Sequence, residues 1–366
     1  MEARSPGQAI MIGTPTPEQA EAATFINTRQ CALTTRAGKG VHVSGEDGTS
    51  VSAEAFYANW DGHEIKHLKI VHDELRTKHS SIVFLAGDSS LDNKAWFEDE
   101  ADALNGYEEF LRPPVMRMDI SYWMNFEAVQ RGVEHMACLN TSIEATTLAS
   151  RQFGLLPADK FIRDHISAQD YLVVSVGGND VALKPSPCTI INMLMLVRCA
   201  SASCLRRCSC SCLPFAGYCG GRVTESGCPG CSRSLLGCAC PPGLAYFADL
   251  FGNSIRDYVL RLIGSARPRK VLVCCIYFLD QQGSGWADEA LAALDYDRNP
   301  RRLQEAIRAI FRLATRRIRH AGINVVAIPL FEALDGRDTG DYVSRVEPSP
   351  VGGKKIADVL MNAILE

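Results

Sequence analysis

Ser89 is the residue of this sequence best placed to act as a nucleophile. It lies in Gly87-Asp88-Ser89, directly after the apolar run Ile82–Ala86. A buried strand that ends at a glycine presents the next side chains at the carboxyl edge of a parallel sheet, where open α/β folds bind their ligands. A serine hydroxyl at such a turn can attack an acyl carbon when a neighbouring base takes its proton. The alternative is a structural turn in which Asp88 or Ser89 caps a helix.

A second polar turn follows another apolar run. The run Tyr171–Val176 leads into Gly177-Gly178-Asn179-Asp180. The Asn179 amide can donate a hydrogen bond to the oxyanion that develops during acyl transfer. A turn that uses glycine and asparagine for unusual backbone angles is the alternative. Because parallel strands end at the same edge of a sheet, we expect Ser89 and Asn179 to share one site.

Five apolar runs predict the strands that position these turns. Their near-continuous apolar character is typical of parallel strands that helices cover on both faces. The clearest helix is expected over Asn299–His320, with Pro300 in its first turn and Gly322 after its end. This alternation predicts an α/β fold, a three-layer α/β/α sandwich with a parallel, flavodoxin-like sheet. The five runs are Ile82–Ala86, His135–Leu139, Tyr171–Val176, Lys270–Phe278 and Asn324–Ile328.

With these motifs the chain resembles the SGNH (GDSL-type) hydrolase family from about Ile82 to Glu366. The resemblance implies the SGNH hydrolase fold, Ser89 as the nucleophile and Asn179 as an oxyanion-hole donor. The family has a further donor, the backbone N–H of a glycine, and Glu144 stands at that position here. The remaining residues expected in the oxyanion hole or cleft are Gly87, Asp88, Asp92, Asn140, Gly178 and Asp180.

The last motif departs from the family. The family has Asp-x-x-His before Pro-Ser, whereas Ser344 and Glu347 occupy those positions before Pro348-Ser349. A carboxylate with an ordinary pKa of about 4.3 is a poor base for an alcohol. Burial can raise that pKa, and a Ser–Glu pair then works slowly. The alternative source of a base, in place of Glu347, is a histidine that reaches the site from elsewhere, for example from the N-terminal segment.

The leading hypothesis is therefore a serine hydrolase that cleaves an acyl ester of a lipid, carbohydrate or small molecule, with Glu347 as a non-standard acid/base. The alternative is a catalytically impaired pseudo-hydrolase that binds a small ligand in the same cleft. The loop Gln281–Trp286 follows the run Lys270–Phe278 at the same sheet edge and is expected to shape specificity. No cofactor is expected.

The composition argues against several other functions. The 366 residues carry a net charge of -4, so nothing indicates a nucleic-acid partner. No run is long and apolar enough to span a membrane, and the start lacks the apolar core of a secretory signal, which favours a cytoplasmic location. We expect an N-terminal extension over residues 1–80 that packs on a main domain over 81–366. The oligomeric state is left open.

Cysteine and histidine are unevenly distributed. Ten of the 15 cysteines lie between Cys199 and Cys240, in a stretch without a period of about 2 or 3.6 residues. A disordered surface insertion is expected there; a zinc site and a sequence artefact are the alternatives. The histidines at 63, 67, 72 and 79 are expected at solvated helix positions, although His63 and His67 have the spacing of a metal pair. No metal site is therefore expected. Three further cysteines, Cys138, Cys274 and Cys275, are expected in the core.

Overall fold

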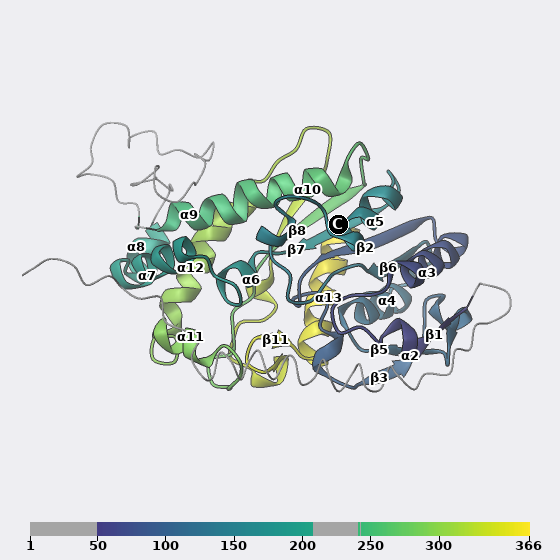
Figure 1. Ribbon diagram of the computed structural model, residues 1–366, viewed down its shortest axis with the longest axis horizontal. Coiled ribbons are helices and arrows are strands. Elements are labelled where there is room, and N and C mark those ends of the chain that lie inside the picture. The colour runs from purple at the N-terminus through teal and green to yellow at the C-terminus, as the bar shows by residue number, and fades with distance from the viewer. Residues whose placement is uncertain (1–49, 208–240, 242) are drawn as a thin grey trace, which may run out of the picture. The chain divides into compact units, whose positions relative to one another are not determined.

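The apolar runs form a five-stranded parallel sheet in the order β6-β2-β7-β8-β9 (Figure 1). The computed structural model describes residues 50–207, 241 and 243–366, all of which belong to the compact unit His42–Glu366. The first strand of the sheet in sequence lies between the second and the third, which is the flavodoxin-like order. The predicted fold class is confirmed. The strands are β2 (Ser81–Gly87), β6 (Met136–Asn140), β7 (Tyr171–Ser175), β8 (Lys270–Cys275) and β9 (Val325–Pro329).

Helices cover both faces of this sheet. The connection from β2 to β6 crosses the sheet in the opposite direction to the three later connections, which lead from β6 to β7, from β7 to β8 and from β8 to β9. Right-handed crossovers therefore place α4 (Ile120–Gln130) on one face and α5 (Pro157–His165), α10 (Ile255–Ile263) and α12 (Pro300–Leu313) on the other. The last helix, α13 (Pro350–Leu365), packs beside α4 (Figure 1). The three layers follow from the strand order.

Residues before the sheet also contribute to the core. Helix α3 (Ile65–Lys78) contacts β2 and α5, and its Leu68, Val71 and Leu75 are fully buried. The N-terminal extension up to residue 80 stays a prediction for residues 1–49, which lie outside the described residues.

Short elements connect the layers. The described residues also form three two-stranded sheets. These pair β1 (Val51–Ser52) with β4 (Leu111–Arg112), β3 (Glu100–Asp102) with β5 (Val115–Arg117), and β10 (Tyr342–Val343) with β11 (Glu347–Pro348). The remaining helices are α2 (Ala53–Phe56), α6 (Gly178–Val181), α7 (Pro187–Cys199), α8 (Ala202–Arg207), α9 (Leu244–Ala248) and α11 (Asp288–Ala293).

Two expected elements are shorter than predicted. The helix expected over Asn299–His320 ends at Leu313, because Ala314 leaves the helical region of backbone angles and a separate turn follows over Thr315–Arg317. The strand expected over Lys270–Phe278 ends at Cys275, and the next residue, Ile276, lines a cavity instead. In both cases the apolar pattern continues past the end of the element.

The beginning of the cysteine-rich stretch is helical, which corrects the expectation of disorder for residues 199–207. Cys199 ends α7, and α8 packs against α12 with Leu205 fully buried. The Leu205 carbonyl accepts a hydrogen bond from Arg312 Nη2. Residues 208–240, which include the cysteines of the suggested zinc site, lie outside the described residues. Cys138, Cys274 and Cys275 are buried in the core, as predicted.

Three of the N-terminal histidines are buried, so the expectation of solvated helix positions is wrong for them. His63 precedes α3, stacks on Phe56 and forms a 2.7 Å hydrogen bond through Nδ1 with the Phe56 carbonyl. His72 is buried within α3, and His79 bridges the carbonyls of Glu134 and Asn105. In the part of the chain that the structure describes, no group of three or more His, Cys, Asp and Glu side chains could hold a metal ion, and no helix is long and apolar enough to cross a membrane.

The first turn of α13 contains two glycines with different surroundings. A Cβ at Gly352 would lie 2.1 Å from the Asp341 carbonyl oxygen, whereas the nearest contact of a Cβ at Gly353 would be an ordinary 3.4 Å. We expect Gly352→Ala to lower the free energy of unfolding by about 1–3 kcal/mol. Gly353→Ala is expected to raise it by up to about 1 kcal/mol, because alanine favours the helix. Denaturant unfolding measures both, and equal effects of the two substitutions would contradict this account.

Candidate active site

Ser89 lies in a single tight turn at the end of β2. A Cβ at Gly87 would lie 2.4 Å from the Ser175 carbonyl oxygen, so only glycine fits where β2 passes the end of β7. The next residue, Asp88, accepts hydrogen bonds from the backbone N–H (3.1 Å) and hydroxyl (2.7 Å) of Ser90. Burial raises the pKa of Asp88 to about 6. Asp88 therefore caps the turn, and the Ser89 side chain is not used for capping.

Glu347 is the acidic group beside Ser89. It lies in β11 and is 2% exposed, and the carbonyl of the next residue, Pro348, accepts a 2.9 Å hydrogen bond from Asn93 Nδ2. Burial raises the pKa of Glu347 to about 7, although the nearby Ser89 hydroxyl and Trp286 indole lower it. Its Oε2 atom has no hydrogen-bond partner among the described residues. A carboxyl group with such a pKa is half ionised near neutral pH.

A second buried carboxyl group, that of Glu144, lies near Glu347. Burial is the main cause that raises the pKa of Glu144 to about 9, and the charges of Glu347 and Asp92 raise it further. Its Oε2 atom also lacks a hydrogen-bond partner within the described part of the chain. Two adjacent carboxyl groups resist ionising together. Glu144 is therefore protonated and neutral at the pH at which Glu347 ionises.

A buried ion pair fixes the turn that carries Glu144. Asp92 Oδ1 accepts a 2.6 Å hydrogen bond from Lys94 Nζ, and Asp92 Oδ2 accepts a 3.1 Å bond from the Glu144 backbone N–H. Both side chains of the pair are almost fully buried. The resemblance to the SGNH family implies an oxyanion-hole donor at this N–H. Here it is already bound to Asp92.

Asn179 lies at the end of β7, in the turn that begins α6. Gly177 precedes this turn with φ +101°, a backbone conformation that favours glycine. One N–H of the Asn179 amide donates to the Thr146 carbonyl at 3.1 Å, which leaves the second N–H free of that bond. The backbone N–H of Ser89 likewise has no hydrogen-bond acceptor among the described residues. Both residues line the same cavity.

The other sequence-predicted residues divide into two groups. Gly178 and Asp88 line the cavity with Ser89. Asn140 and Asp180 instead hold neighbouring loops: Asn140 Nδ2 donates to Asp119 Oδ2 at 3.0 Å, and the Asp180 carboxylate accepts the N–H groups of Leu148 and Ala149. The structure therefore brings Ser89, Asn179, Glu347, Gly178 and Asp88 together. The side chains of Asn140, Asp180 and Asp92 instead hold the neighbouring loops.

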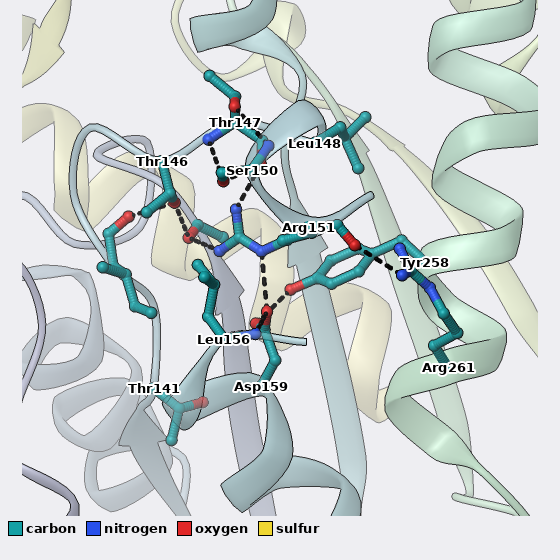
Figure 2. A network of polar contacts seen from close by, with 12 residues as sticks. Thr141, Thr146, Thr147, Leu148, Ser150, Arg151, Leu156, Asp159, Tyr258 and Arg261 are labelled. Carbon is teal, nitrogen blue, oxygen red and sulfur yellow. Dashed lines mark hydrogen bonds and ion pairs between the residues drawn. The ribbon is translucent and has the colours of Figure 1, made fainter. Parts of the chain in front are cut away.

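Arg151 is a supporting residue that the sequence analysis missed (Figure 2). It is fully buried, and its guanidinium donates to the carbonyls of Gly87 (3.1 Å) and Thr147 (3.0 Å) and to Asp159 Oδ2 (3.0 Å). Asp159 Oδ1 accepts a further bond from the Tyr258 hydroxyl. Arg151 thus links the end of β2 to α5 and α10. No local pattern in the sequence marks this arginine.

A cavity of about 130 Å³ opens beside Ser89. Asp88, Ser89, Ser90, Ser175 and Asn179 contribute its polar part, and Trp286 of the loop Gln281–Trp286 also lines it. The rest of its wall is mainly apolar and includes side chains from α7, α9, α11 and α12. The site therefore joins a serine, an acidic group and an apolar chamber.

The neutral state of Glu144 makes stability depend on pH. Because the pKa of Glu144 is raised, the folded chain holds this proton more tightly than the unfolded chain. The stabilisation that the proton provides is complete below about pH 4.5 and is lost as the pH rises toward about 9. Glu144→Gln keeps the shape without the ionisation. We expect its Tm to exceed that of the wild type at pH 9 and the gap to shrink at pH 5. A constant gap, measured by thermal unfolding across this range, would disprove the assignment.

Comparisons with known proteins concern the fold. No family model and no curated protein match the chain. Among solved structures, it is similar to a protein described as a GDSL-like lipase from Parabacteroides merdae (14% identity, TM-score 0.38, covering 78% of this chain and 96% of that chain). It is also similar to an acetyl xylan esterase from Geobacillus stearothermophilus (12%, TM-score 0.40, 78% and 95%) and a carbohydrate acetylesterase from Sinorhizobium meliloti (10%, TM-score 0.35, 78% and 98%).

These structures are described as lipases and esterases. In this chain the five strands have the flavodoxin-like order, and the turns of Ser89 and Asn179 lie at the ends of the adjacent strands β2 and β7.

Proposed function

We propose that this protein is a serine ester hydrolase in which Ser89 is the nucleophile and Glu347 the acid/base. The observation that carries the proposal is the buried carboxyl group of Glu347 beside the Ser89 hydroxyl. Its pKa of about 7 lies where a general base is most effective at neutral pH. Burial thus brings the pKa of a glutamate into the range near neutral pH in which the imidazole of a histidine ordinarily titrates.

In the first step the Glu347 carboxylate takes the proton of Ser89 as Oγ attacks the carbonyl carbon of the ester. The carbonyl oxygen becomes an oxyanion, for which the free N–H of Asn179 and the backbone N–H of Ser89 are the donors. Protonated Glu347 then gives its proton to the departing alkoxide, and the acyl group remains on Ser89.

In the second step a water molecule attacks the acyl-enzyme. Glu347 removes the proton of this water, and a second tetrahedral oxyanion forms at the same donors. Its collapse breaks the bond to Ser89 Oγ, which recovers the proton from Glu347, and the carboxylic acid leaves. Burial raises the pKa of Glu347, and, with Glu144 neutral and Asp92 paired with Lys94, Asp88 is the acidic neighbour whose charge raises it further.

Ser89→Ala is expected to abolish hydrolysis of a short-chain p-nitrophenyl ester and labelling by a fluorophosphonate, because no nucleophile remains. Ser80→Ala, at an exposed serine before β2, is the matched control and should keep both. Release of p-nitrophenol and mass spectrometry of the labelled peptide measure the two effects. If the wild-type protein is not labelled by the fluorophosphonate and does not hydrolyse the ester, yet binds a small ligand, the result would favour the pseudo-hydrolase alternative.

The acid/base role of Glu347 predicts a pH profile. Because Glu347 must be ionised to accept the proton, kcat/KM should rise with pH through about 7 and then level off. Glu347→Gln is expected to lower kcat/KM by about 10²- to 10⁴-fold and to remove this rise. Glu332→Gln, at an exposed glutamate, is the control. A rise centred near pH 4, or one that survives Glu347→Gln, would show that another group is the base.

A further inference from the structure

The cavity beside Ser89 has a polar end and an apolar interior. Ser89 and Asn179 stand at the polar end, whereas side chains such as Leu196 of α7, Phe247 of α9 and Ile310 of α12 line the interior. These three are almost fully buried. Figure 1 shows α7, α9 and α12 grouped together, and they are in mutual contact. Asp88 is the one charged residue among those that line the cavity.

The cavity has the size of a short hydrocarbon chain. Its volume is about 130 Å³. An apolar protein cavity of about 150 Å³ stays dry and binds one benzene molecule, which has six carbon atoms. The hydroxyl of a sugar would find few partners in such an interior, and an unpaired hydroxyl is costly to bury. An acyl chain of about six carbons fits both the size and the chemistry.

We propose that this cavity binds the acyl chain of the substrate and selects esters of medium-chain fatty acids, with an optimum of about six carbons. This inference rests on the proposed function, because it places the ester carbonyl at Ser89. The acyl group, unlike the alcohol, remains bonded to Ser89 between the two steps. The alcohol must leave and water must replace it, so a dry chamber suits the acyl chain.

Chain-length dependence of p-nitrophenyl ester hydrolysis by the full chain tests the proposal. Burial of one methylene contributes about 0.8 kcal/mol, which corresponds to about fourfold in kcat/KM. From acetate to hexanoate we therefore expect a rise of up to about 200-fold. Decanoate should react more slowly than hexanoate, because its chain exceeds the cavity. Hexyl acetate, in which the long chain belongs to the alcohol, should show no such gain over ethyl acetate.

Ala306 offers a direct test of the wall. It is 1% exposed, lies on α12 and lines the cavity, so Ala306→Leu fills part of the space. The ratio of hexanoate to acetate kcat/KM should fall at least tenfold. Ala292→Leu, at an exposed position of α11 outside the cavity, is the matched control and should keep the ratio. An unchanged ratio in a folded Ala306→Leu protein would overturn the proposal.

A binding measurement separates this proposal from the proposed function. The ketone 2-heptanone has a hexanoyl chain that cannot be hydrolysed, and it should raise the Tm of Ser89→Ala protein more than acetone does. Such binding without any hydrolysis by the wild type would reject the proposed function and support the cavity. Ser89-dependent hydrolysis that favours acetate, or a gain that follows the alcohol chain, would reject the cavity and leave the proposed function standing.

Discussion

Three donors from the one connection between β6 and α5 converge on the carbonyl of Gly87. It accepts hydrogen bonds from the Ile143 backbone N–H and from Arg151 Nη2, each at 3.1 Å, and from Thr146 Oγ1 at 3.4 Å. The same residue has no room for a side chain, because β7 passes against it. The end of β2 is therefore fixed by neighbours on several sides. The position of Ser89, two residues further on, and the approach of the loops that carry Glu144 and Asn179 depend on this arrangement.

Burial decides the electrostatics of the site. In water both Glu144 and Glu347 would be ionised at neutral pH, and neither would be an effective base. In the structure desolvation raises the pKa of each, and the proximity of the two makes the increase larger for Glu144. One carboxyl group then titrates near neutrality while the other stays neutral. Apolar side chains that exclude water also line most of the adjoining cavity.

Local patterns explain what could be predicted from the sequence. The strands were predictable because a buried parallel strand needs a nearly continuous apolar run, and the turns because each run ends at glycine beside polar residues. The errors arose where a residue's partners are distant in sequence. The pattern of Asn299–His320 continues beyond α12. Residues Ala202–Arg207 form α8, in which Leu205 is fully buried and which packs against α12. The spacing of His63 and His67 favoured a helix that includes both residues. In the structure His63 lies before the start of α3, and its ring stacks on Phe56.

By itself the sequence determined the parallel sheet, its layers and the two turns of Ser89 and Asn179, since apolar runs and glycines act locally on the backbone. It also placed Glu347 in the frame before Pro348-Ser349. The tertiary structure alone decided that Glu347 is desolvated, that Asp92 occupies the backbone N–H of Glu144, and that Arg151 supports Gly87. Each of these depends on which groups lose water together. That is a property of segments packed against one another, and no single stretch of sequence contains it.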